Sequence, residues 1–260
     1  MAKKGGWAAF PHDNSAFVYE GAALKKNWAQ LHKGDAEPFS SNKEVEQAWR
    51  LFHAGDFQAA FETGIAAGME GYNVANKAAC IYFNYLETSD DKKQKAFEEI
   101  AARCEALQAA QKKNANAFYW HAYALGRYGQ LIGVAKALTQ GIGGKVRASL
   151  ETAIELEPKH ADAHIAMGTF NAEVIEKVGA MIGKMTYGVS KDAAVEMYEK
   201  ALKLNPGSAI ARTEMADGLY RLFGDKKMKD VERLYAEAAA ITPADAMECL
   251  DVEAAKAELE

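Results

Sequence analysis

A glycine-rich stretch ending in lysine, Gly141-Ile-Gly-Gly-Lys145, is the segment of the chain that most resembles a phosphate-binding loop. Such a loop needs a further glycine six residues before the lysine, a hydroxyl directly after it and a strand in front. Here those two positions hold Thr139 and Val146, and both flanks have helical apolar spacing. We therefore interpret the stretch as a turn between helices rather than a nucleotide site.

Two histidines four residues apart, His160 and His164, form the one metal-like pattern. Side chains with this spacing can share a helix face and bind zinc. However, His160 lies in the turn after Pro158, and His164 takes a helix position that usually packs inward. No cysteine or second histidine pair is near in sequence. We predict one packed and one solvated histidine, with no metal site and no cofactor.

Catalytic patterns are equally weak. The sequence has neither a nucleophile elbow nor a zinc-protease motif. Cys80, Cys104 and Cys249 are widely spaced and odd in number, which favours small core residues over disulfides. Glu173 and Glu176 are interpreted as solvated or capping charges. The sequence thus favours a protein that is not an enzyme, although a site assembled from distant residues stays open as an alternative.

Composition is ordinary for a globular chain of 260 residues, with 49% hydrophobic and 26% charged residues and a net charge of -5. Basic and acidic residues are interleaved, so nucleic-acid binding is not expected. No apolar run is long enough to span a bilayer, and Met1–Trp7 carries two lysines without the apolar stretch of a signal peptide. A cytoplasmic location is the expectation; a chain from which a leader had been removed would read the same way.

A repeated phrase organises the second half of the chain. A bulky residue, a small one, an apolar one and a proline recur at offsets 0, 3, 6 and 8 in Leu150–Pro158, Tyr198–Pro206 and Tyr235–Pro243. The bulky and small residues share one helix face, where the small one permits close approach of a neighbouring helix. The proline ends the helix. Such recurrence predicts stacked helical repeats.

A second helix follows the first two prolines at a fixed distance. After Pro158 and Pro206, an alanine and then a methionine followed by a small residue come at the same offsets. They are Ala163 and Met167-Gly168 after the first proline, and Ala211 and Met215-Ala216 after the second. An earlier copy runs from Trp49 to Ala60. From about Lys43 to Pro243 the chain resembles the tetratricopeptide-repeat (TPR) superfamily. The resemblance implies an all-α, TPR-like right-handed α-solenoid of about five helix pairs with an atypical N-terminal cap.

The middle repeats are longer than the usual 34 residues of the family. Pro158 and Pro206 are 48 residues apart, and the extra residues fall at 174–188, with a shorter addition between Gly126 and Lys145. Over roughly Ala117 to Pro206, elongated repeats of this kind are similar to the regulator of microtubule dynamics family and to TPR-like components associated with TRAP transporters. The chain also resembles a group of bacterial TPR proteins, from which no biochemical role follows.

Three segments are expected: a capping segment at 1–42, a repeat domain at 43–243 and a C-terminal capping helix at 244–260. Within the first, Trp28 to Asp35 echoes Trp49 to Asp56, each with a histidine four residues after the tryptophan. Apolar periodicity predicts helices at 43–54, 57–68, 72–88, 91–112, 114–128, 145–156, 161–178, 191–204, 208–223, 228–241 and 244–258.

The resemblance implies a concave wall made from the first helix of each pair, which would suit an extended peptide. Amides can pair a peptide backbone, cations its carboxylates, and rings its apolar side chains. The candidate partner-binding residues are Asn73, Asn76, Lys77, Tyr119, Tyr123, Arg127, His164, Asn171, Arg212 and Tyr220. The first hypothesis is therefore an adaptor that binds a protein or peptide in this groove. The alternative assigns the tyrosines to the core and the charges to solvent.

The two insertions carry small-xxx-small spacing and extra apolar residues. Exposed, they would form a patch for a partner, a second copy or a membrane surface, with Leu131, Ile132, Val134, Met181, Ile182 and Met185 as its candidate residues. Buried, which is the outcome we favour, they would be two lengthened helices packed through glycine. Two further hypotheses follow: a small-molecule carrier or enzyme with a site between groove and insertions, and a self-assembling structural component.

Overall fold

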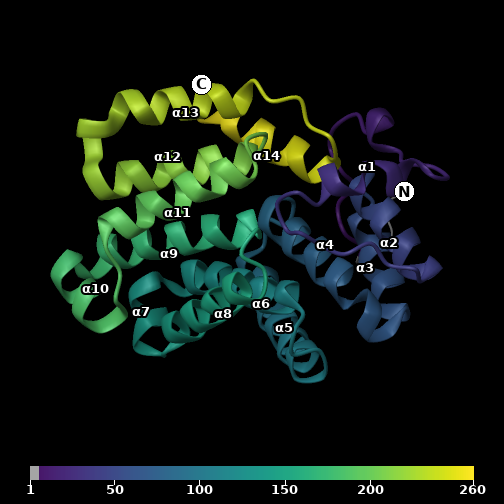
Figure 1. Ribbon diagram of the computed structural model, residues 1–260, viewed down its shortest axis with the longest axis horizontal. Helices are drawn as coiled ribbons and strands as arrows, with labels where there is room; N and C mark the ends of the chain where they lie inside the picture. The colour runs from purple at the N-terminus through teal and green to yellow at the C-terminus, as the bar shows by residue number, and fades with distance from the viewer. Residues whose placement is uncertain (1–5) are drawn as a thin grey trace.

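The computed structural model describes residues 6–260, and within that range the secondary structure is entirely helical (Figure 1). Residues 1–5 of the predicted capping segment, which include the two N-terminal lysines, lie outside the described residues. No helix in the described part of the chain is long and apolar enough to cross a membrane.

The helices follow one another in antiparallel pairs. In chain order they are α1 (Ala23–Leu31), α2 (Lys43–His53), α3 (Phe57–Ala66), α4 (Tyr72–Tyr85), α5 (Asp90–Ala110), α6 (Ala115–Ile132), α7 (Val134–Thr139), α8 (Ile142–Leu156), α9 (Ala161–Val178), α10 (Ala180–Tyr187), α11 (Lys191–Leu204), α12 (Ala209–Phe223), α13 (Met228–Ala239) and α14 (Ala246–Ala257). Short 3-10 turns lie at Ser15–Phe17, Gly68–Gly71 and Gly224–Lys227. The all-α, TPR-like solenoid predicted from the repeats is confirmed.

Polar residues just before the helices set where they begin. Asn114, Ser190 and Ser208 each accept a hydrogen bond from the backbone N–H three residues on. This contact satisfies an amide that has no partner inside the helix. The turns with Pro158 and Pro206 end α8 and α11, as the repeat phrase predicts.

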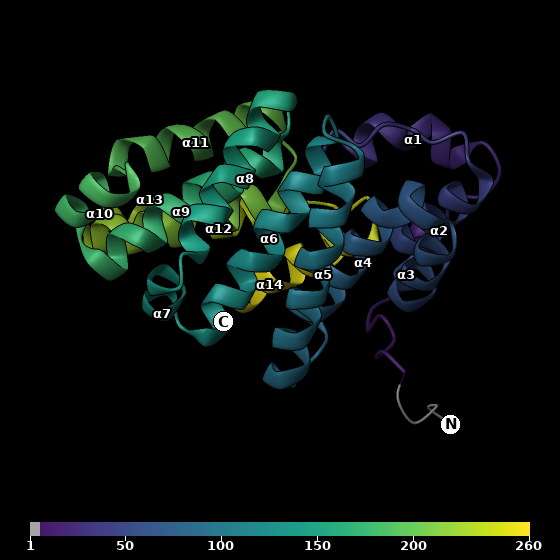
Figure 2. The same ribbon diagram turned by 90° about the horizontal axis from the view of Figure 1, so that it is seen from below.

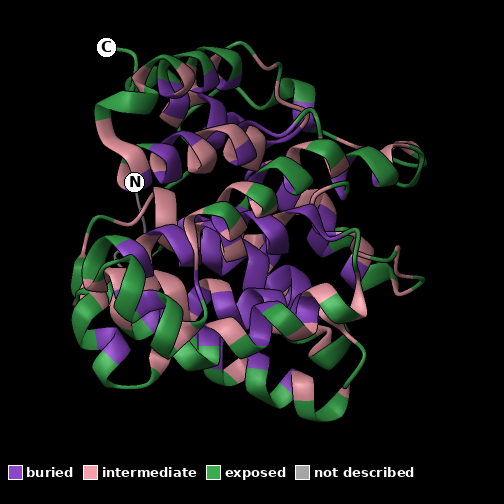
Figure 3. Ribbon diagram, turned by 60° about the vertical axis from the view of Figure 1, so that its left-hand side comes forward, coloured by how far each residue is buried: buried purple, intermediate pink, exposed green. Residues whose placement is uncertain are grey.

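The repeat pairs α2/α3, α4/α5, α6/α8, α9/α11 and α12/α13 pack side by side along the chain. Tyr198, the bulky residue of the second phrase, lies between Gly168 on α9 and Gly218 on α12. It is only 1% exposed. Buried positions accordingly gather on the facing sides of the helices, and exposed ones on the outside (Figure 3).

The two insertions are separate short helices rather than extensions of their neighbours. Gly133 and Gly179 have φ of 94° and 80°, a backbone conformation that glycine adopts without a side-chain clash, and they separate α7 from α6 and α10 from α9. The prediction of two lengthened, buried helices is therefore wrong. On α7, Ala137 and Leu138 are buried, whereas α10 leaves its apolar residues exposed.

The concave side of the solenoid is filled by the two ends of the chain. Helix α14 packs against α2, α12 and α13, and Figures 1 and 2 show it crossing the inside of the curve. From the other end, the Trp7 ring stacks on Tyr82 at a centroid distance of 4.3 Å. Residues 6–42 and α14 therefore occupy much of the space that an open TPR groove would leave to a partner.

Candidate functional site

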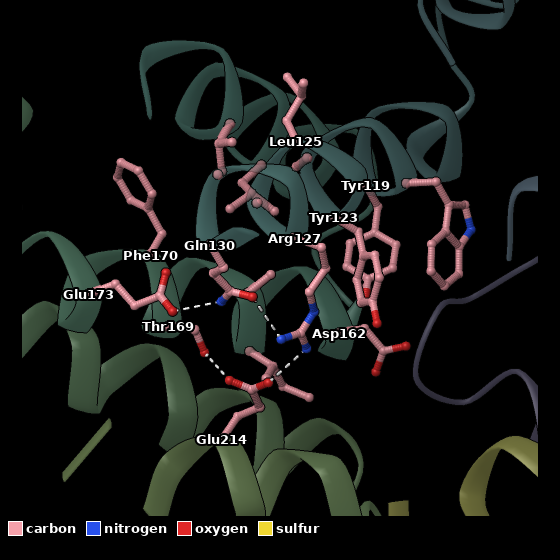
Figure 4. Close-up of a pocket in the computed structure, with 18 of the residues that line it drawn as sticks. Tyr119, Tyr123, Leu125, Arg127, Gln130, Asp162, Thr169, Phe170, Glu173 and Glu214 are labelled. Atoms are coloured by element: carbon pink, nitrogen blue, oxygen red, sulfur yellow. Dashed lines mark hydrogen bonds and ion pairs between the residues drawn. The ribbon is translucent and has the colours of Figure 1, made fainter. Parts of the chain in front are cut away.

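A cavity of about 130 Å³ remains on the concave side, between α6, α8, α9, α12 and α14. Its apolar part is lined by side chains from α6 to α9, including Val134, Leu138, Ile142, Val146, Phe170 and Val174. Its polar part is lined by Tyr119, Tyr123, Arg127, Asp162, Glu214 and Asp251, among others (Figure 4). The cavity is thus amphipathic.

Helical spacing brings these polar residues together. Tyr119, Tyr123 and Arg127 are four residues apart on α6, which places them along one face. On α9, Thr169 and Glu173 lie four residues apart and face the same space from the opposite wall (Figure 4). The register of two repeat helices therefore builds the polar wall.

Arg127 is the centre of a hydrogen-bonded network of side chains. Its guanidinium donates to Glu214 Oε1 at 3.2 Å and to Gln130 Oε1 at 3.1 Å, and its Cζ lies 5.2 Å from the centroid of the Tyr123 ring. Thr169 Oγ1 donates to Glu214 Oε2 at 2.8 Å. The cation is therefore already neutralised and oriented by the chain itself.

Glu173 extends this network toward α12. Its carboxylate accepts from Gln130 Nε2 at 2.7 Å and from Arg221 Nη1 at 3.3 Å. Burial raises the pKa of this carboxyl, and the Arg221 charge opposes the rise. The interpretation of Glu173 as a solvated or capping charge is wrong, because its side chain is half-buried, lines the cavity and is bonded to Gln130 and Arg221.

Asp162 and Tyr119 occupy the other end of the polar wall, where Asp162 lies against Gly34 of the N-terminal segment. Among residues 6–260, neither the Asp162 carboxylate nor the Tyr119 hydroxyl has a side-chain hydrogen bond, although Tyr119 is only 6% exposed. Burial raises the pKa of Asp162 to about 7, and the neighbouring Asp35 charge adds to the rise. The fully buried side-chain nitrogen or oxygen that lacks a hydrogen-bond partner among residues 6–260 is instead Trp120 Nε1, which also belongs to the cavity lining, whereas Asp162 is partly exposed.

Asp251 is the contribution of α14 to the cavity. Its carboxyl accepts from the Tyr85 hydroxyl at 2.5 Å. Burial raises its pKa to about 8, only partly opposed by that hydrogen bond. Because Tyr85 belongs to α4, this contact joins the C-terminal helix to the concave wall.

Next to the cavity lies a buried network that sequence reasoning did not predict as a unit. Lys77 Nζ pairs with Asp35 at 2.7 Å, and its ammonium lies 5.1 Å from the centroid of the Phe52 ring. His32 Nδ1 contacts the same Asp35 carboxylate at 2.9 Å. The echo of Trp28–Asp35 by Trp49–Asp56 was the available signal, since it contains both His32 and His53. What it could not give is that the two histidines meet.

Five of the ten predicted partner-binding residues are both buried and bonded inside the chain, away from the cavity. Asn73 donates to Glu37 Oε2 at 2.8 Å, and Asn76 accepts from Arg103 Nη1 at 2.8 Å. Together with Lys77, these buried side chains are not available to a peptide in this structure. His164 contacts the Pro158 carbonyl at 3.1 Å, and Asn171 donates to the Met167 carbonyl at 2.7 Å.

The other predicted residues divide between the cavity and the surface. Tyr119, Tyr123 and Arg127 come together in the cavity. Arg212 pairs with Glu237 at 3.3 Å, and Tyr220 is 52% exposed. The concave wall therefore does not present the ten residues as one surface.

The histidine pair does not form a metal site. His160 Nδ1 accepts from Ala163 N at 3.1 Å and its Nε2 contacts Asn116 Oδ1 at 2.9 Å. Both His160 and His164 are fully buried, so the prediction that one of them is solvated is wrong. Within residues 6–260 no group of histidine, cysteine, aspartate or glutamate is arranged to hold a metal ion.

A second, wider cleft of about 840 Å³ lies between residues 35–41 and the turn before α6. Its buried polar groups are mutually bonded, since Asn73 and Asn116 both donate to Glu37. Burial raises the pKa of Glu37 to about 8. With its polar groups satisfied, this cleft is a weaker candidate than the cavity.

Antiparallel helix pairs stacked into a curved array, with the first helix of each pair on the inside, define a TPR-like helical-repeat protein. Residues 44–258 match the family described as Regulator of microtubule dynamics protein 1-3, and the chain belongs to that family. The solved crystal structure of a thermophilic TPR protein from Thermus thermophilus is similar in fold, with a TM-score of 0.57 and 15% identity over 83% of this chain and 98% of that one. A sequence search of curated proteins found no match.

Proposed function

We propose that the protein is a binding protein for a small molecule, which it holds in the cavity on its concave side. TPR-like folds generally mediate protein interaction, and this chain has that fold. The observation that carries the finer proposal is an amphipathic cavity at the place where the groove would otherwise be, with two polar groups that have no side-chain partner among residues 6–260. Ligand sites are typically apolar cavities with a few polar groups that fix orientation.

The size of the cavity limits its occupant. Its volume of about 130 Å³ is close to that of engineered cavities of about 150 Å³ that bind benzene. A single aromatic ring or a short alkyl chain would fit. An extended peptide would first have to displace α14 or residues 6–42, which supply buried bonds to the concave wall.

Binding rather than catalysis is proposed because the strongest charges of the cavity are fixed on one another. Arg127 and Glu214 form an ion pair, and Glu173 is held by Gln130 and Arg221. Groups held in this way are not free to exchange a proton with a reacting group, which general acid and base work requires.

The test compares a variant that fills the cavity with one that adds the same bulk outside it. Ala166 lines the cavity on α9, and Ala148 is exposed on α8. We expect Ala166→Phe to abolish saturable binding of benzyl alcohol measured by calorimetry, and Ala148→Phe to leave it unchanged. Equal binding by both variants, or no binding by the unaltered protein of any ring-sized probe, would contradict the proposal.

A second function, self-association, is favoured by the exposed ridge on α10. Met181, Ile182 and Met185 are 76%, 56% and 82% exposed, an apolar cluster that is unusual on a free surface. Of the predicted patch, Leu131, Ile132 and Val134 are half-buried and do not share this exposure. Sedimentation of the full chain over a wide concentration range tests the idea, because a strictly monomeric species would end it.

A further inference from the structure

The charges around the cavity point to the sign of its ligand. Of the described residues that line it, Arg127 is the only basic one, whereas Asp162, Glu173, Glu214 and Asp251 are acidic. Arg127 is already paired with Glu214 at 3.2 Å. An anionic ligand would therefore meet carboxyl groups without a free cation to receive it, and a cationic ligand would meet at least one carboxylate without a partner.

Asp162 is the group most exposed to such a ligand. It is the second residue of α9, and its backbone N–H donates to the Gly34 carbonyl at 3.0 Å. Its carboxylate lies against Gly34, where a Cβ would stand only 2.5 Å from Oδ1. A glycine at this place leaves the carboxylate room at the cavity wall without giving it a hydrogen-bond donor.

Aromatic rings surround the same end of the cavity. Tyr119 and Tyr123 hang from α6 toward Asp162 (Figure 4), with their ring centroids 6.3 Å apart, and Trp120 lies 5.4 Å from Tyr123. Ring faces attract cations, and a carboxylate among rings is the usual setting for an organic ammonium group. The Tyr119 side chain lines the cavity, and its hydroxyl, which has no side-chain partner among residues 6–260, can accept an N–H from the same group.

The raised pKa of Asp162 is consistent with a missing partner. Burial is the largest cause of the raised pKa. The positive charge of Lys77, which is paired with Asp35, opposes that rise only in part. A cation bound at the carboxylate would compensate the cost of burying the negative charge.

We propose that the ligand of this cavity is a small primary ammonium compound. Its charge lies on Asp162, its N–H groups face Tyr119 and Tyr123, and its ring or short alkyl chain packs against the apolar lining one turn along α9 from Asp162, at Ile165 and Ala166. This inference rests on the proposed small-molecule function and names its ligand class. The ammonium donates to the Asp162 carboxylate, and the apolar part leaves water for the apolar wall.

The experiment uses three probes of nearly equal size on the full chain: benzylammonium, benzyl alcohol and benzoate, measured by calorimetry at pH 8. We expect benzylammonium to bind at least about tenfold more tightly than benzyl alcohol, the effect of roughly 1.4 kcal/mol from one charge-assisted hydrogen bond. Benzoate should bind more weakly than both. Equal affinity for the ammonium and the alcohol, or tighter binding of benzoate, would overturn the ligand class while leaving the small-molecule function in place.

Two variants localise the effect. Asp162→Asn should bring the affinities for benzylammonium and benzyl alcohol within about twofold of each other, since only the charge is lost. Its matched control is Asp192→Asn, because Asp192 is likewise the second residue of its helix, α11, but is exposed. Should Asp162→Asn fail to fold, Tyr119→Phe serves instead, with a several-fold loss for the ammonium alone.

Failure of the broader function has a different signature. Suppose that none of the three probes binds the unaltered protein, and that no probe shifts the thermal unfolding of the unaltered protein relative to that of Ala166→Phe. Both proposals then fall together. If benzyl alcohol binds and is lost in Ala166→Phe, but Asp162→Asn leaves the ammonium preference intact, only the ammonium site is wrong.

Discussion

The Nε2 atoms of His32 and His53 lie 3.3 Å apart in the buried centre of the protein. Each imidazole contacts a carboxylate through its other nitrogen, His32 with Asp35 at 2.9 Å and His53 with Asp245 at 2.7 Å. The chain of four side chains therefore joins the end of α1 to α2 and to the residue that caps α14.

Removing His53 should release α14 from the concave side. His53→Ala leaves the buried Asp245 carboxylate without its side-chain partner, and an unmade hydrogen bond to a buried charged group typically costs about 3 kcal/mol. We expect that loss in denaturant unfolding, together with faster amide exchange in residues 246–257. His12→Ala, at an exposed histidine, should change neither quantity by more than about 0.5 kcal/mol.

Lys77 should behave as a structural residue. It is 1% exposed, pairs with Asp35 and lies near the rings of Trp49 and Phe52. Lys77→Met should lower the free energy of unfolding by about 3–5 kcal/mol, because Asp35 is left as an uncompensated buried charge. In Lys77→Met/Asp35→Asn the loss should be smaller than the sum of the two single losses. Additive losses would mean that the two side chains do not depend on each other.

Stability should fall as pH rises toward 8. Burial raises the pKa of Asp251 to about 8 and that of Glu37 to about 8, whereas unfolded carboxyls titrate near 4. The folded chain thus holds protons that the unfolded chain releases, and the stability they contribute is present at low pH and lost as pH rises through 8.

The titration of His32 changes stability in the opposite direction, but only at lower pH. Burial lowers the pKa of His32 from 6.5 to about 4, so its contribution is lost as pH falls through that window and is constant above it. Between pH 6.5 and 8 we therefore expect the free energy of unfolding to decrease, by up to about 1.4 kcal/mol per pH unit for each carboxyl that titrates. Denaturant titrations at three pH values measure the slope, and Asp251→Asn should reduce it. A slope that is flat or positive would contradict the assignment.

The repeat architecture could be predicted from the sequence because its signals are local. Proline positions, alanine spacing and polar caps fixed α8, α9, α11 and α12 to within a few residues. The concave interior could not be predicted in this way. The contact of His53 with Asp245 spans 192 positions and that of Lys77 with Asp35 spans 42, so no periodicity records them.

For the same reason, the candidate site was anticipated only in part. Tyr119, Tyr123 and Arg127 share a helix face, which their spacing already shows. The sequence does not single out Asp162, because its role depends on Gly34, which is far away in sequence but in contact through space. The filled groove depends on where the two chain ends pack, and nothing in their composition states it.

The α10 ridge can be altered without changing the fold. Met181 and Met185 are 76% and 82% exposed, so Met181→Glu/Met185→Glu removes few packing contacts and should change the free energy of unfolding by less than about 1 kcal/mol. If the ridge mediates self-association, the double variant should be monomeric at concentrations where the unaltered protein is not. Identical sedimentation of an associating pair would place the interface elsewhere.

The contact of Gly218 with Tyr198 should tolerate little added volume. A Cβ at Gly218 would lie 2.6 Å from Tyr198 Cε2, and one at Gly168 would lie 2.8 Å from Cε1 of the same ring. Since the ring is enclosed by glycine on both sides, it cannot move away from one without approaching the other. Gly218→Ala should therefore cost about 1–3 kcal/mol through overpacking, despite the helix-favouring change. Gly144→Ala, at an exposed helix position where a Cβ meets nothing within 4 Å, should instead be neutral or stabilising by up to about 1 kcal/mol. Thermal unfolding of the two variants measures the difference, and equal stability would show that α9 and α12 can separate around Tyr198.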